Sequence, residues 1–201
     1  MAVQAAPLHF PEFGEVPETK RHLKLRTLLF EFLELAFAHQ NAVGCDQFVY
    51  WDAADPRVCL APDAFVRLGE PDSLFGSWKV WEHSGPPHVA IEISSSDDSR
   101  DRDWKAKLAR YARLGVLELV RFDAETSAAR LRIWDRKDAE LVERDLATAS
   151  AMSSVLPGFW LEVAQPNLGP TLRLSRDEGG LDLYLTKTEQ LEILLRQANQ
   201  G

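Results

Sequence analysis

Three side chains in the middle of this 201-residue sequence are of types that suit one kind of chemistry: Asp63, Glu92 and Lys107. Two carboxylates held close together repel each other unless a cation neutralises them, and their oxygens are ligands that Mg²⁺ and Mn²⁺ prefer. Such an ion polarises a phosphate oxygen and lowers the pKa of bound water, while a nearby lysine orients that water or stabilises the developing charge. The set therefore predicts metal-dependent hydrolysis of a phosphodiester.

The two acids come from neighbouring strand-like runs. Side chains around Glu92 alternate between two faces, with Val89, Ile91 and Ile93 on one and Ala90, Glu92 and Ser94 on the other. A carboxylate there is either a solvent-facing edge residue or a functional acid, and the apolar neighbours favour a central strand and hence the functional role. The main-chain carbonyl of Ile93 would add a further ligand. Asp63 after Pro62 is typical of a turn or strand entry, but it lies within a run, 58–67, that could pair beside the Glu92 strand.

Lys107 lies inside the apolar stripe of a predicted helix over residues 100–114. Trp104, Lys107, Leu108 and Tyr111 follow i, i+3, i+4, i+7 spacing and so share one face, which should pack on the sheet. A lysine there is costly unless it is paired. It could extend to solvent at the stripe's edge, pair with Asp103 one turn earlier, or point at the two carboxylates.

Other candidates are weaker. Tyr111 could reach the site through its hydroxyl, although a core aromatic is its default role. His22 and Glu34, on a predicted first helix, could add to the site, although a surface position is the default for both. The histidines do not show metal-ligand spacing, and Cys45 and Cys59 are expected to be reduced core thiols. No cofactor-binding motif is found.

The order of predicted elements favours an α/β (α+β) fold with a mixed sheet flanked by helices. A helix is expected over 18–39 and a turn at 41–44, followed by strand-like runs. Gly115 should end the second helix, and a capping box formed by Thr186 and Glu189 should open a short C-terminal helix. We expect an irregular N-terminal arm, 1–17, and a single domain, 18–201.

The amino-acid composition limits the kinds of molecule that the protein is expected to bind. A net charge of −8 and a pI of about 5.2 argue against bulk, non-specific binding of nucleic acid. Basic residues on the second helix could still form a local patch or an ordinary solvated face: Arg100, Arg102, Lys105, Arg110 and Arg113. No signal-peptide layout and no apolar run of membrane-spanning length is seen, which predicts a cytoplasmic protein without a membrane partner.

Four segments together resemble the Uma-type (Uma-two) restriction-endonuclease family, a branch of the PD-(D/E)XK nuclease superfamily. They are the Pro-Asp strand at 62–66, the strand 89–95 with Glu92, the helix signature from Asp103 through Lys107 to Tyr111 and Ala112, and the run from Gly115 to Asp123. The apolar run 156–161 resembles the family's closing segment more loosely. Leu117 and Leu119 replace the more usual aromatic residues.

The resemblance implies a restriction-endonuclease-like fold and a Mg²⁺ site, with Mn²⁺ as a substitute, built from Asp63 and Glu92. Many relatives in the wider superfamily carry the lysine two residues after the glutamate, where this sequence has Ser94. The resemblance therefore points to Lys107 as a migrated lysine, the residue that the helical spacing also selects.

We expect a nucleic-acid substrate, with DNA as the first hypothesis. Two alternatives stay open at this point. One is a catalytically inactive nuclease-like fold that serves as a binding or assembly module, with a homodimer as one form. The other is an RNA or nucleotide phosphodiesterase with the same site, because fold and metal site do not choose the substrate.

Overall fold

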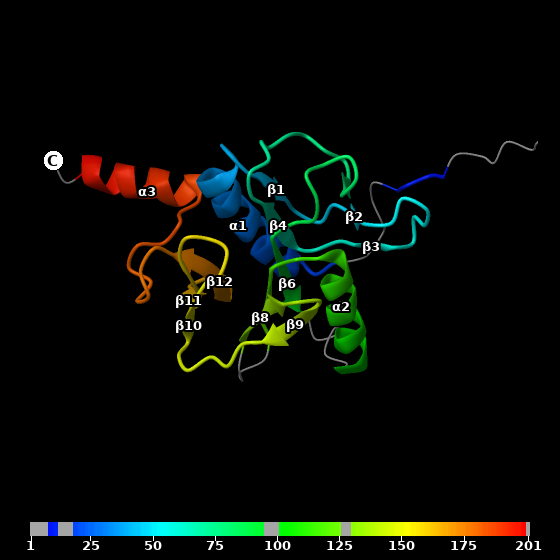
Figure 1. Cartoon of the computed structure of the whole chain (residues 1–201). Helices are drawn as coiled ribbons and strands as arrows, with labels where there is room; N and C mark the ends of the chain where they lie inside the picture. Colours follow the sequence, from blue (N-terminus) through cyan, green and yellow to red (C-terminus); the bar gives the residue numbers. More distant parts are fainter. Residues whose placement is uncertain (1–7, 12–17, 95–100, 126–129, 200–201) are drawn as a thin grey trace, which may run out of the picture.

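The computed structural model describes residues 8–11, 18–94, 101–125 and 130–199, with only the backbone described for 101–103. In chain order its elements are α1 (Lys20–Phe37), β1 (Ala42–Gly44), β2 (Val49–Tyr50), β3 (Cys59–Leu60), β4 (Ala64–Arg67), β5 (Trp78–Lys79), β6 (Val89–Ser94), α2 (Asp101–Leu114), β7 (Glu118–Asp123), β8 (Leu131–Lys137), β9 (Glu140–Glu143), β10 (Ser150–Met152), β11 (Phe159–Gln165), β12 (Gly169–Ser175) and α3 (Lys187–Ala198). Figure 1 shows their arrangement.

A six-stranded mixed sheet forms the centre, in the order β1-β4-β6-β7-β8-β9. Only β6 and β7 are parallel neighbours in it, and α2 is the crossover that joins them. Two small sheets, β3-β2-β5 and β10-β11-β12, stand beside the large one. This arrangement confirms the expected mixed α/β (α+β) fold. None of the helices that the structure describes combines the length and apolarity needed to span a membrane.

The predicted alternation of β6 decides which helix covers which face. Val89, Ile91 and Ile93 belong to a buried cluster that includes the apolar side of α1, whereas Ala90 belongs to a second cluster with the apolar side of α2. The C-terminal sheet adds to the first cluster and the sheet around β2 to the second. The central strands are therefore covered on both faces, and Glu92, Glu118 and Arg121 on β6 and β7 are buried.

The two covering helices begin and end close to where the sequence predicts. Thr19 is the N-cap of α1, and its hydroxyl accepts a hydrogen bond from the His22 N–H. Gly115, with φ of +104°, follows α2 and donates its N–H to the Tyr111 carbonyl, as expected of a glycine after a helix. The expected capping box of Thr186 and Glu189 opens α3. The predicted loop after Ser94, and Arg100, lie outside the described residues.

The expected turn at 41–44 is wrong, because Ala42–Gly44 forms β1 and pairs with β4. Gly44 suggested a turn, but it is needed for close packing, since a Cβ on it would lie 2.1 Å from the Phe65 ring. The single run expected at 58–67 is divided into β3 and β4, with Asp63 just before β4. Strands β10 and β12 were not predicted. The single domain over 18–201 stays a prediction.

A buried carboxylate joins the C-terminal sheet to the central one. Glu118, at the start of β7, is fully buried and accepts hydrogen bonds from Ser153, Ser154 and the Trp160 indole. Arg144 donates to it at 3.3 Å and also to Asp135. A buried charge is tolerated when its oxygens are all satisfied in this way.

We predict that Glu118→Ala destabilises the protein strongly. The change leaves buried donors without an acceptor, which should lower the free energy of unfolding by about 3 kcal/mol. Urea denaturation followed by circular dichroism measures this. Glu143→Ala is the control, because the exposed pair of Glu143 with Arg132 should contribute less than about 1 kcal/mol. Equal effects of the two changes would contradict the importance of the buried network.

Candidate active site

The pairing of β4 with β6 brings the two predicted acids together. Ala64 is the partner of Ile91 in this antiparallel ladder, so one further step places Asp63 opposite Glu92. Both residues are buried, with 7% and 4% of their surface exposed. The Asp63 Oδ2 atom accepts a hydrogen bond of 2.7 Å from the Ile93 N–H. The sheet register therefore fixes the two carboxylates as neighbours.

Helix α2 brings two donors to Glu92. The Lys107 Nζ atom donates to Glu92 Oε2 at 2.7 Å, and the Tyr111 hydroxyl donates to Glu92 Oε1. Lys107 and Tyr111 are one helical turn apart, so both can point to the same carboxylate. About 31% of the Lys107 side chain is exposed. Lys107 therefore points at the carboxylate site, which is one of the three arrangements considered for it. The side chain of Asp103, its other possible partner, lies outside the described residues.

Helix α1 brings His22 to the other carboxylate. The His22 Nε2 atom lies 2.8 Å from Asp63 Oδ1, and the hydrogen bond raises the pKa of His22 above its usual value against the opposing effect of burial. A surface position was the default expectation, and the structure instead places this side chain at the site. Glu34, in contrast, is twelve residues further along α1, about 18 Å away at roughly 1.5 Å per residue. It is not brought to the site.

The environment of Glu92 favours its protonated form. Burial raises the pKa of Glu92 to about 7, Lys107 acts to lower it, and the nearby charge of Asp63 raises it again. Burial also raises the pKa of Tyr111 well above its ordinary value, so this hydroxyl remains a donor. Additional positive charge beside Glu92 would favour the ionised form.

Arg121 is a residue of this site that the sequence reasoning missed. It is the partner of Glu92 in the parallel ladder of β6 and β7, and only 8% of it is exposed. Its guanidinium lies over the Trp104 ring, 4.3 Å from the centroid, and its Nε atom donates to the Ser94 hydroxyl at 3.3 Å. A charged residue between Val120 and Phe122 was the available signal, by the same reasoning that selected Glu92.

The donor set fits a hard divalent cation. Mg²⁺ is commonly held by one or two carboxylates and otherwise by water, and each carboxylate has about four lone-pair positions. Asp63, Glu92 and the Ile93 carbonyl supply oxygens of that kind, and the hydrogen bonds described above use only part of their capacity. Among the residues that the structure describes, no cluster of three or more His, Cys, Asp or Glu side chains is positioned to hold a metal. Water would therefore have to complete the coordination.

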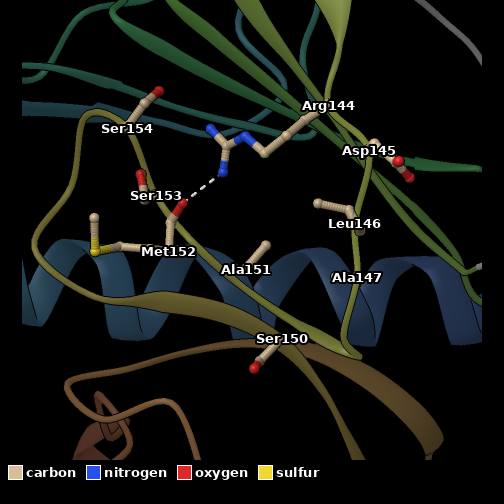
Figure 2. Close-up of a pocket in the computed structure, with 9 residues that line it drawn as sticks. All are labelled: Arg144, Asp145, Leu146, Ala147, Ser150, Ala151, Met152, Ser153 and Ser154. Atoms are coloured by element: carbon tan, nitrogen blue, oxygen red, sulfur yellow. Dashed lines mark hydrogen bonds between the residues drawn. The ribbon is translucent and has the colours of Figure 1, made fainter.

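A small hollow borders the site between α1 and the end of β6. Its volume is about 10 Å³, room for roughly one water molecule, and His22, Ile93 and Ser94 are among the residues that line it. A larger hollow of about 380 Å³ lies elsewhere, along the connection from β9 to β10 (Figure 2). Its arginine, Arg144, donates to the Met152 carbonyl and to Asp135, so this hollow belongs to the Glu118 network rather than to the site.

A comparison with known proteins identifies the family of the chain. The model of the Uma2 family, described as "Putative restriction endonuclease", matches residues 12–164. The chain belongs to the Uma2 family. The resemblance expected from the sequence is thus confirmed, and the matched part contains all three predicted catalytic residues. The match ends within β11, so β12 and α3 lie beyond the part shared with the Uma2 model.

One solved structure similar to this Uma2 chain is that of "a putative nuclease belonging to DUF820" from Anabaena variabilis. It aligns with a TM-score of 0.48 and 12% sequence identity, covering 71% of this chain and 75% of that one. A comparison with curated proteins finds no match.

We predict that Glu92→Gln stabilises the protein at high pH relative to low pH. The folded-state pKa of Glu92 lies above the ordinary value of 4.5, so the folded state binds more protons between these two values. Glu92 therefore lowers the free energy of unfolding as pH rises from about 4.5 to about 7. Relative to the wild type, the variant should gain roughly 3 kcal/mol between about pH 4 and pH 8, measured by urea denaturation.

Gln190→Ala, an exposed change on α3 that removes no titratable group, is the control, and its difference from the wild type should stay constant with pH. A difference between wild type and Glu92→Gln that stays constant with pH would contradict the raised pKa of Glu92.

Proposed function

We propose that this Uma2 protein is a divalent-metal-dependent endonuclease that hydrolyses phosphodiester bonds of DNA. One observation carries the proposal: a lysine and a tyrosine from α2 converge on Glu92, the partner of Asp63 in the sheet register. Membership of the family described as "Putative restriction endonuclease" supports the same class of reaction. Water would attack the phosphorus atom, the bond to one ester oxygen would break, and the products would be a phosphomonoester and a free hydroxyl.

Asp63, Glu92 and the Ile93 carbonyl would hold Mg²⁺, with Mn²⁺ as a substitute. The bound ion would supply a Lewis acid that polarises a phosphate oxygen and lowers the pKa of water. Each carboxylate is already fixed by the protein, Asp63 by the Ile93 N–H and His22, and Glu92 by Lys107 and Tyr111. Such fixed ligands need little rearrangement when they bind.

Lys107 would act on the reacting groups directly. Its side chain is partly exposed while the ammonium donates to Glu92, so Lys107 would be able to reach both the carboxylate and a molecule bound at the surface. In this position it would orient the attacking water and stabilise negative charge that develops on the phosphate. Tyr111 is fully buried and would keep the Glu92 carboxylate in place.

The distribution of charge supports a polyanionic substrate in spite of the net charge of −8. The two segments that bring side chains to the site, residues 20–26 and 101–114, hold nine of the 23 Lys and Arg residues but only two of the 31 acids. Lys20, Lys24, Lys105 and Arg113 are exposed on these segments. Glu18 and Asp46 also lie beside this end of α1, where Arg26 pairs with both. The positive charge that a phosphate backbone would meet is therefore that of the exposed Lys and Arg side chains on the two segments.

We predict that the folded wild type binds Mn²⁺ and that Asp63→Asn and Glu92→Gln abolish this binding. Each change removes a carboxylate charge while it keeps the size of the side chain. Isothermal titration calorimetry measures the binding, in the absence and presence of a DNA duplex, because substrate oxygens can complete the coordination.

Glu34→Gln is the matched control and should bind Mn²⁺ as the wild type does, because Glu34 lies far from His22 along α1. No binding by the folded wild type with DNA present would refute the metal site and favour the alternative of an inactive binding module. Loss of binding in Glu34→Gln would show that the ligand set is wrong.

We further predict that Lys107→Ala lowers the rate of DNA cleavage by on the order of 100-fold while Mn²⁺ binding persists. The reason is that Lys107 would act on the water and the phosphate rather than on the ion. Cleavage of a plasmid with added Mg²⁺ is the assay, and Lys137→Ala, an exposed change at the end of β8, is the control. An RNA of matched sequence, tested in parallel, distinguishes DNA from RNA hydrolysis.

A further inference from the structure

Among the residues that the structure describes, helix α3 is anchored to the rest of the protein near its beginning. Its first turn carries the capping box, and the buried Arg173 donates to both carboxylate oxygens of Glu189 at 2.7 and 2.9 Å. From residue 190 to residue 199 every side chain is exposed. Figure 1 shows α3 extending away from the sheets and from α2. The helix therefore has a long surface that nothing else in the described part of the chain covers.

An apolar stripe runs along this surface. Leu191, Leu194, Leu195 and Ala198 follow i, i+3, i+4, i+7 spacing, and 59%, 60% and 63% of the three leucines is exposed. Successive residues turn by about 100° around a helix, so Glu189 lies about 160° away from Leu191. Because Arg173 holds Glu189 against the protein, the leucine stripe on the opposite side of α3 points away from the sheets.

Such a helix is an uncommon state for a protein in water. Isolated helices shorter than about 12–15 residues are marginal, and most helical stability comes from packing of the apolar face. Contiguous exposed apolar side chains mark surfaces that bind a partner. The stripe thus has the properties of one half of a helix–helix contact.

We propose that the leucine stripe of α3 pairs with the same stripe of a second copy of the chain, with the two helices antiparallel about a two-fold axis. In this arrangement Leu191 of one copy faces Leu194 of the other, and the contact is made twice. Three of the residues that flank the stripe, Thr188, Gln190 and Gln197, are uncharged, and the fourth, Glu192, pairs with Arg196 of its own helix at 3.6 Å. Two copies of net charge −8 can therefore approach here with little repulsion between like charges.

The ends of the helices are also complementary. Lys187, at the start of one helix, would lie near the last carbonyls of the other, where positive charge is favourable. Helix α3 follows the segment that the family model matches, so this surface belongs to the part of the chain outside that match. A pair of 12-residue helices buries less than the roughly 1,600 Å² of a standard interface, so the dimer should dissociate on dilution.

Sedimentation equilibrium of the whole chain tests the proposal. Up to about 100 µM, the mass of the wild type should rise from 22.7 kDa towards twice that value. A double variant, Leu191→Glu with Leu194→Glu, should stay at the mass of one chain. Ile193→Glu, which makes the same kind of change on the side of α3 away from the stripe, should associate as the wild type does.

A charge-exchange experiment separates a lost contact from a lost helix. A second double variant, Leu191→Lys with Leu194→Lys, should also stay monomeric alone, but it should form a mixed dimer when combined with the Glu variant, since opposite charges then face each other. Wild type that stays at 22.7 kDa over the whole range would overturn the proposal. So would a Glu double variant that associates as the wild type does, or a mixture of the two variants that remains monomeric.

Discussion

The antiparallel register between β4 and β6 is the constraint on which the site depends. It sets Asp63 opposite Glu92 on a sheet that helices cover on both faces, so the two carboxylates are both close and buried. Buried like charges are unfavourable, and the protein responds by surrounding them with donors from both helices. A shift of one residue in the pairing of β4 with β6 would turn one of the acids to the other face of the sheet, and the two carboxylates would no longer be neighbours.

The same constraint determines which elements supply the polar side chains around the two acids. Lys107 and Tyr111 come from α2, His22 from the start of α1 and Arg121 from β7. Each of these elements adjoins the paired end of β4 and β6 through a hydrogen bond or a ladder position. The site is therefore assembled from rigid helices and strands, which favours a fixed geometry over one that forms only when a ligand binds.

Sequence reasoning could predict what depends on short-range periodicity. The alternation around Glu92 and the helical spacing of Lys107 and Tyr111 are local patterns, and the structure has both. The proximity of His22 to Asp63 depends on pairing between distant segments, which no local pattern specifies. Gly44 is a case in which a local pattern was misleading. A glycine there is typical of a turn, but this glycine is required because the Phe65 ring packs against it. Arg121 and Glu118 have the same local signal as Glu92, a charged residue within an apolar strand, so the sequence pattern could also have identified these two residues as buried polar groups.

The position of β12 has a consequence for work with shortened forms of the chain. The family match ends at residue 164, yet Leu172 and Leu174 of the next strand are almost fully buried in the core that α1 shares. A fragment trimmed to the matched segment would lose these side chains and leave β11 with an open hydrogen-bonding edge. Exposed edges of this kind template association between chains. Aggregation of such a fragment would then result from the missing strand β12 and would not show that the whole protein is unstable.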